Sequence, residues 1–157
     1  MNWNEFKQNV EQWASERGIY EHSTPEAQLL KALSELGELS DAIIKNDHEA
    51  LKDAIGDVAV CMVNYARLAG EYITNPDSTE KTEGTTALIG ALSIYIGGHI
   101  MSAEEKRFID AYRTFETLVA ICKNEGTTFI HCCARAWNEI KDRKGLMVPG
   151  GAFVKEG

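Results

Sequence analysis

The fold of this chain is decided by one stretch, residues 29–70, which reads LLKALSELGELSDAIIKNDHEALKDAIGDVAVCMVNYARLAG. Its apolar residues recur every three or four positions on either side of a polar turn at 45–47, which predicts two consecutive helices. The apolar positions that define these helices are Leu33, Leu36, Leu39 and Ile43, then Ile55, Val58, Val60 and Val63. We therefore expect a helical hairpin at the centre of an all-α protein.

Each of these two helices carries a pair of acidic residues inside its apolar pattern. Glu35 and Glu38 are three residues apart, and Asp53 and Asp57 are four apart, so each pair shares one helix face. Carboxylates at the edge of an apolar core repel each other unless protons or a cation neutralise them. Oxygen ligands alone favour a hard cation, Mg²⁺ or Mn²⁺, which keeps water ligands and bridges to phosphates. The alternative is a solvated helix face, which is common for such pairs.

Two glycines stand beside the acidic pairs, in the interior of the expected helices. Gly37 and Gly56 each cost a helix about 1 kcal/mol relative to alanine. Glycine in such a position favours the close approach of another backbone. We therefore expect the two helices to pack tightly against each other near the acids.

The segments SELGELSDAI (34–43) and LKDAIGDVAVCMV (51–63) resemble the MazG-like branch of the all-α nucleoside triphosphate pyrophosphatases. The resemblance implies Mg²⁺-dependent hydrolysis of a nucleoside or deoxynucleoside triphosphate to the monophosphate and pyrophosphate. The family holds the metal with Glu-x-x-Glu on one helix and Glu-x-x-Asp on the next. On this chain the resemblance implies Glu35, Glu38 and Asp57 as metal ligands, and we take Glu38 as the base that accepts the proton of the attacking water.

The chain departs from the family pattern at Ala54, where the family has the first acid of the second helix. Asp53 is the nearest acid, about 100° away around the helix. Two interpretations stay open: Asp53 supplies a fourth ligand, or three carboxylates and water hold the metal. The alternative function is a nucleotide- and metal-binding module that hydrolyses poorly because of Ala54.

Two further classes of protein are weighed against this function. A di-iron carboxylate bundle needs Glu-x-x-His pairs on two helices, and none of the four histidines has a glutamate three residues before it. A purely structural helical protein would leave the acidic pairs unexplained.

Three further residues are candidates for contact with the substrate. Lys31 lies one turn before Glu35 and either pairs with it on the surface or approaches a phosphate. Asn64, seven residues after Asp57, returns to nearly the same helix face and either contacts the sugar or base or is a satisfied core amide. Trp13 lies in the apolar stripe of an expected first helix and is expected to pack in the core; the resemblance implies the alternative that Trp13 or Phe6 contacts the nucleobase.

The C-terminal segment AWNEIKDRKGLMVPGGAFVKEG holds the strongest basic cluster of the chain, at Lys141, Arg143 and Lys144. Its Arg-Lys-Gly run also resembles the ending of the last helix in the MazG-like branch. The resemblance implies that these cations approach the triphosphate, including across a subunit boundary. The alternative is that they only complement the dipole at the end of a helix.

The remaining pattern predicts about six helices in a single domain spanning 1–157, with a loop at about 74–84 and an extended tail at about 145–157. The helices are expected at 2–16, 25–45, 46–69, 85–101, 102–123 and from 127 onward. His22 is expected in a loop, a capping box is expected at Asn46 and Glu49, and Phe108 belongs to the apolar stripe of the fifth helix. The helix at 85–101 is apolar on all faces and must be buried, in part by another subunit, so we expect a dimer or tetramer.

Composition sets limits on the partners and location. A net charge of −8 argues against binding duplex nucleic acid, but it allows a nucleotide bound through Mg²⁺. No signal peptide is visible, and the longest apolar run, 87–101, is too short to span a bilayer. Four cysteines without Cys-x-x-Cys spacing favour reduced thiols. We therefore expect a cytoplasmic protein with neither a membrane nor a nucleic acid as partner.

Overall fold

Seven helices and a short β-hairpin form the protein in a computed structural model that describes residues 1–76, 78–105 and 111–156. The predicted all-α class is confirmed. The elements are α1 (Trp3–Glu16), α2 (Ile19–His22), α3 (Pro25–Ile44), α4 (His48–Ala69), α5 (Thr85–Glu105), α6 (Tyr112–Asn124), α7 (Phe129–Ile140), β1 (Gly145–Met147) and β2 (Phe153–Lys155).

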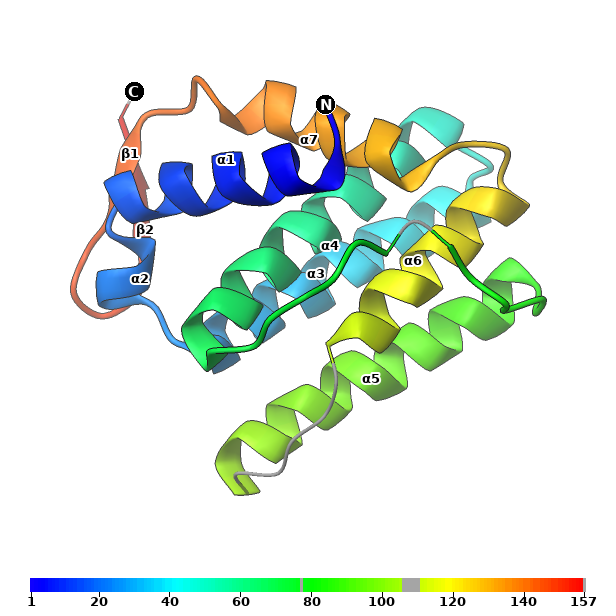
Figure 1. Ribbon diagram of the computed structural model, residues 1–157, viewed down its shortest axis with the longest axis horizontal. Coiled ribbons are helices and arrows are strands. Elements are labelled where there is room, and N and C mark those ends of the chain that lie inside the picture. Colours follow the sequence, from blue (N-terminus) through cyan, green and yellow to red (C-terminus); the bar gives the residue numbers. More distant parts are fainter. Residues whose placement is uncertain (77, 106–110, 157) are drawn as a thin grey trace.

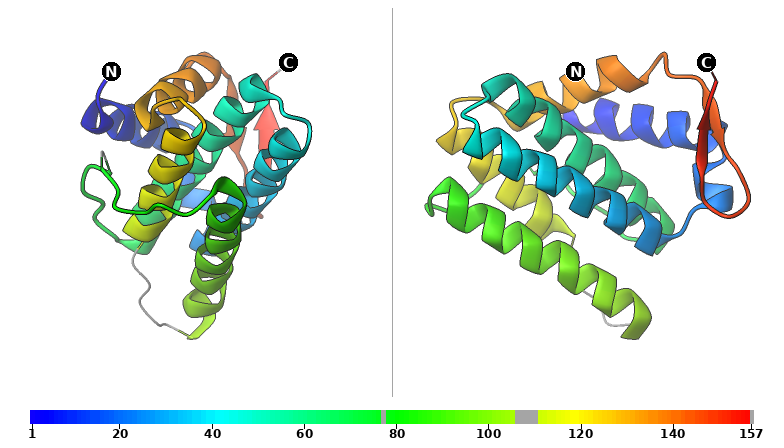
Figure 2. Two further views of the ribbon diagram at one scale, coloured as in Figure 1. Left: turned by 90° about the vertical axis from the view of Figure 1, so that its right-hand side faces the viewer. Right: turned by 180° about the vertical axis from the view of Figure 1, so that it is seen from behind.

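The hairpin of α3 and α4 runs through the middle of the molecule (Figure 1). Helices α1 and α7 contact each other and lie across one side of α4, whereas α5 packs on α3 and α6 packs on α5 at the other side (Figures 1 and 2). The strands β1 and β2 pair antiparallel at one end, beside α2. The acidic pairs therefore lie on the two helices against which α1, α7 and α5 pack.

Local sequence explains where the central helices begin and end. The Thr24 side chain accepts a hydrogen bond from the Ala27 amide, and Pro25 fills the first turn, as in the expected start of α3. Helix α4 ends at Gly70, whose φ of 73° is the left-handed conformation that glycine adopts readily. The predicted capping box at Asn46 is wrong, because Asp47 is the cap and accepts from the Ala50 amide. Asn46 occupies the turn with a positive φ instead.

Helix α5 buries one stripe and leaves the opposite face open. Leu88, Leu92 and Ile96 are buried, while Ile94 and Met101 remain 71% and 65% exposed. The single chain therefore buries only part of this helix, and burial of the open face by another subunit stays a prediction. Within the described residues, only the window Thr85–Ser102 has the length and composition to cross a membrane. The prediction that this apolar run is too short to span a bilayer is therefore wrong. One such helix is weak support for a membrane span, since core helices share these properties.

Three boundaries differ from the prediction. Residues 102–105 continue α5 instead of starting the next helix, which is α6 and begins at Tyr112; Phe108 lies outside the described residues. His22 ends the short helix α2, so its expected loop position is wrong. The C-terminal tail folds back on itself as a hairpin in which Gly145 pairs with Lys155 and Met147 with Phe153.

The two mid-helix glycines have different surroundings. A Cβ atom at Gly56 would lie 2.4 Å from the Cys132 carbonyl oxygen and 2.7 Å from the Ala136 Cβ, so Gly56 allows α7 to approach α4. A Cβ atom at Gly37 would meet no atom within 4 Å among the described residues. The predicted close packing is therefore real at Gly56, but α7 and not α3 is the neighbour.

Candidate active site

A cavity of about 440 Å³ gathers most of the residues predicted to form the site. Its lining comes from α1, α2, α3, α4, the end of α7 and the C-terminal segment that includes the β-hairpin. Six of the predicted residues line it: Lys31, Glu35, Asp57, Asn64, Trp13 and Arg143. A larger cavity, of about 730 Å³, lies near the start of α1 and has no acidic side chain among its described lining residues. The smaller cavity is therefore the candidate active site.

The two carboxylates in this cavity come from opposite helices of the central hairpin. Glu35 lies on α3 and Asp57 on α4, and both are largely shielded from solvent. Burial, together with the nearby carboxylates of Glu35, Glu139 and Asp53, raises the pKa of Asp57 from 3.8 to about 7, against the lowering effect of Lys31. The cavity therefore holds negative charge that the protein does not fully neutralise.

Three cations share the cavity with these acids. The Lys31 ammonium lies 2.7 Å from a Glu35 carboxylate oxygen, and this bond raises the lysine pKa. Arg143 and Lys155 reach the cavity from the segment after α7 and from β2. That segment is tied to α1, because the Arg17 side chain donates to the Arg143 carbonyl at 2.8 Å and the Met147 amide donates to the Arg17 carbonyl at 2.7 Å. The C-terminal segment therefore adds positive charge to the lining that contains the acids.

Trp13 forms an apolar wall of the cavity. Its ring stacks on Phe153 of β2 with centroids 6.1 Å apart, and the Arg17 guanidinium lies 4.8 Å from its centroid. The indole is buried between α1 and the hairpin. Trp13 therefore packs in the core and also lines the cavity, so its position is compatible with both the core role and the nucleobase contact.

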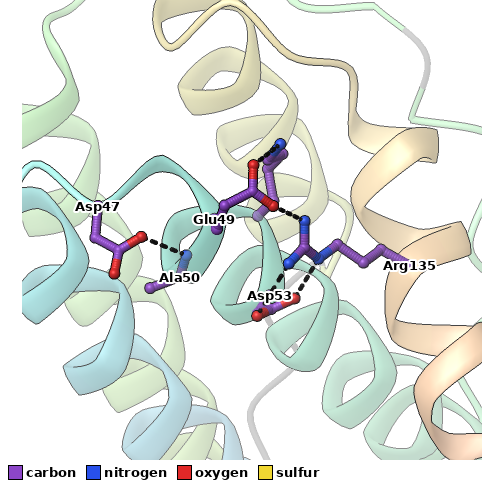
Figure 3. Close-up of polar contacts among 6 residues, drawn as sticks. Asp47, Glu49, Ala50, Asp53 and Arg135 are labelled. Carbon is purple, nitrogen blue, oxygen red and sulfur yellow. Dashed lines mark hydrogen bonds and ion pairs between the residues drawn. The ribbon is translucent and has the colours of Figure 1, made fainter.

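The structure does not bring the other two predicted acids into the cavity lining. Glu38 is exposed on α3. Asp53 pairs with Arg135 of α7, which also pairs with Glu49 (Figure 3). Ala54, where the family has an acid, is buried in the core.

The remaining predicted cations, Lys141 and Lys144, also lie outside this lining. Lys141 is exposed at the end of α7. Lys144 lines a separate hollow of about 530 Å³ with Glu16, Arg17 and Glu156. Lys155, from β2, lines both this hollow and the candidate site.

The donor set in the cavity fits Mg²⁺ in its usual mode of binding. Among the described residues, no three His, Cys, Asp or Glu side chains gather closely enough to hold a metal ion by themselves. Mg²⁺ is commonly bound by one or two carboxylates, with water and substrate phosphates completing six ligands. Glu35 and Asp57 supply two carboxylates whose charge is not fully neutralised.

Sequence reasoning missed several lining residues, and only some of them left a signal. Gln28 lies seven residues before Glu35, so its position on the same face of α3 was predictable from helix periodicity. Lys155 and Ser23 reach the cavity through the hairpin and through α2, and neither element had a periodic pattern to predict it.

Comparison with known proteins identifies the segment that carries both acidic pairs. Residues 23–80 match the family of the MazG nucleotide pyrophosphohydrolase domain. An uncharacterized 18.2 kDa protein of the rep-hol intergenic region of Haemophilus phage HP1 (strain HP1c1) is 46% identical over 59 residues, which cover 38% of this chain and 36% of that protein. No solved structure matches the chain significantly. The predicted resemblance to the MazG-like branch is thereby confirmed for residues 23–80, the part of the chain that is similar to the MazG nucleotide pyrophosphohydrolase domain.

Proposed function

We propose that the protein hydrolyses a nucleoside or deoxynucleoside triphosphate, with Mg²⁺, to the monophosphate and pyrophosphate. The observation that carries this proposal is the single cavity in which Glu35 and Asp57 face Lys31, Arg143 and Lys155. Acids alone would repel a triphosphate and cations alone would not hold a metal. Together they suit a polyphosphate bound with a divalent cation.

The side chains have distinct roles in this proposal. Glu35 and Asp57 hold the cation, which when bound neutralises phosphate charge and orients the attacking water. Arg143 and Lys155 contact phosphate oxygens from the hairpin side, and Arg143 can do so with two parallel hydrogen bonds. Water adds to the α-phosphorus, the bond to the bridging oxygen breaks, and pyrophosphate leaves.

A carboxylate in the cavity accepts the proton of that water. We predicted Glu38 for this role, and Glu38 is exposed outside the lining. Asp57 is better placed than Glu38, because it lines the cavity in which the water would attack.

The test is pyrophosphate release from a panel of ribo- and deoxyribonucleoside triphosphates with Mg²⁺. Glu35→Gln and Glu38→Gln form a matched pair, since both remove one charge from α3 and only Glu35 lines the cavity. We expect pyrophosphate, not phosphate, from the wild type and at least a hundredfold loss in Glu35→Gln. Orthophosphate as the only product, or equal loss in both variants, would contradict the proposal.

A binding module with little turnover is the second candidate function. It is favoured by Ala54, which leaves two carboxylates in the cavity where the family pattern has four acids. Calorimetric titration with a non-hydrolysable triphosphate distinguishes the two. Tight, Mg²⁺-dependent binding without release from any nucleotide in the panel would select the binding module.

A further inference from the structure

A pair of buried amides lines the cavity at some distance from the acids. Gln28 on α3 is 7% exposed and Asn64 on α4 is 3% exposed. Gln28 precedes Glu35 by seven residues and Asn64 follows Asp57 by seven, which is two helical turns or about 10 Å. The helices α3 and α4 lie side by side as an antiparallel hairpin (Figure 2). Gln28 is near the start of α3 and Asn64 near the end of α4, so this arrangement puts the two amides at one level of the cavity and Glu35 and Asp57 at another, nearer the turn.

The Asn64 amide has its orientation set by Tyr20 of α2. The Tyr20 hydroxyl donates to Oδ1 of Asn64 at 2.8 Å. Burial, with a smaller effect of Glu11, raises the pKa of Tyr20, so the hydroxyl keeps its proton and remains a donor. The amide oxygen is thereby occupied, and within the described residues the amide nitrogen has no acceptor. Asn64 therefore offers a donor to the cavity.

The Gln28 amide is oriented the opposite way by Ser23, the residue that follows α2. Its Nε2 donates to the Ser23 hydroxyl at 3.0 Å, which leaves Oε1 without a donor from the described chain. Ser23 follows Tyr20 by three residues, so the two hydroxyls leave the short helix on one side. One helical turn thus fixes one amide as a donor and the other as an acceptor.

Such fixed polarity suits a ligand whose own donors and acceptors are fixed. A sugar hydroxyl rotates to match either partner, so it would gain little from an oriented amide. The edge of a nucleobase presents donors and acceptors in a rigid pattern and is commonly bound beside aromatic side chains. Here the aromatic wall is Trp13 with Phe153. The separation of about two turns from the acids also leaves room for a sugar between phosphates and base.

We propose that Tyr20 and Ser23 are positioning residues that set Asn64 as the donor and Gln28 as the acceptor for the edge of the nucleobase. This inference rests on the proposed function, because it takes the cavity to hold a nucleotide. It assigns base selection to α2, an element that no periodic pattern predicted. Pairing with a fixed donor rejects a wrong base strongly, since a buried polar group is then left without a partner.

The experiment measures equilibrium dissociation constants of ribo- and deoxyribonucleoside monophosphates, with Mg²⁺, for the full chain and its variants. Tyr20→Phe removes only the orienting hydroxyl, and Asn64→Asp replaces the donor nitrogen by an acceptor of the same shape. Tyr72→Phe and Asn4→Asp make the same chemical changes at exposed positions. Melting temperature and circular dichroism establish that each variant is folded.

We expect the wild type and both controls to prefer one base at least tenfold, and Tyr20→Phe and Asn64→Asp to reduce that preference to about twofold or less. The ratio between ribose and deoxyribose forms should stay unchanged. The inference is overturned if base preference survives in Tyr20→Phe, if all dissociation constants rise equally, or if only the sugar ratio moves.

Pyrophosphate release by the wild type, measured in parallel, separates this inference from the proposed function. Base-selective binding that Tyr20→Phe abolishes, without any release, supports the amide pair and contradicts hydrolysis. Release without base preference contradicts the amide pair alone. A protein that neither binds nor hydrolyses any nucleotide overturns both.

Discussion

Asp53 and Asp57 lie one turn apart on α4, and their environments are opposite. Asp53 faces Arg135 on α7, and its charge is neutralised there together with that of Glu49 (Figure 3). Asp57 faces the cavity, where burial and other carboxylates raise its pKa to about 7. Helix spacing makes the two residues look like an equivalent pair, whereas a neighbouring helix decides which of them is left with uncompensated charge.

The largest expected effect is on turnover. Asp57→Asn should lower pyrophosphate release at least a hundredfold, because it removes both a cation ligand and the proposed base. Asp53→Asn should change kcat/KM by less than about threefold, since its charge is paired away from the cavity. Steady-state kinetics at saturating Mg²⁺ measure both. Equal losses in the two variants would mean that Asp53 turns into the cavity when substrate binds.

The next effect is on the packing that brings Arg135 to Asp53. Gly56→Ala should destabilise the protein by about 2 kcal/mol, because the added methyl group meets the Cys132 carbonyl and Ala136. Gly37→Ala is the matched control and should stabilise by up to about 1 kcal/mol, since its new methyl group meets no described atom. Urea unfolding gives both values. A neutral Gly56→Ala would show that α7 shifts without cost.

The raised pKa of Asp57 predicts how stability depends on pH without metal. In the folded state the pKa is about 7 and in the unfolded state it is near 3.8, so between these values the folded protein binds more protons. This contribution to stability is full below about pH 4 and is lost as pH rises through 7, by about 2 kcal/mol after allowance for partial solvation.

Asp57→Asn isolates that contribution, because the other titrating groups are common to both proteins. The stability of the wild type relative to Asp57→Asn should fall between pH 4 and pH 8 in chelator. Added Mg²⁺ should restore it at pH 8 in the wild type only. A difference between the two proteins that does not vary with pH would contradict an uncompensated carboxylate at Asp57.

The smallest effect concerns the ion pair itself. Arg135→Gln removes the partner of Asp53 and should cost about 1 kcal/mol at low ionic strength and less in 1 M salt, as for other accessible ion pairs. Lys45→Gln removes an exposed pair with Asp41 on α3 and serves as the control. Thermal melts at two salt concentrations suffice. A cost that salt leaves unchanged would indicate that Arg135 acts by packing.

Helix periodicity was sufficient for the central hairpin and for four of the residues that line the cavity beside it. Lys31, Glu35, Asp57 and Asn64 lie on two long helices, where residue spacing fixes the face. The same rule failed for Asp53, because Arg135 is 82 residues away in the chain and no local pattern predicts that contact.

The parts that were not predicted are short elements held by distant partners. Helix α2 spans four residues, and the strands span three each, too few for a period to show. The hairpin is held by contacts with Arg17 and Trp13 of α1. Its Lys155 reaches the cavity only through that arrangement, whereas the predicted Lys141 and Lys144 end outside the lining. Glu38 illustrates the converse, an exposed acid whose motif position alone indicated a role.

The tie between Arg17 and the Arg143 carbonyl has a consequence for the order of folding. It closes a loop of 126 residues, whereas the hairpin of α3 and α4 is built from near neighbours in the chain. Local contacts form early and distant ones late, since a large loop loses more entropy on closing. The side of the cavity formed by α3 and α4, with Glu35 and Asp57, should therefore assemble first. The side formed by Arg143 and the C-terminal hairpin should assemble last. In refolding experiments, helix signal should recover before any ability to bind a polyphosphate.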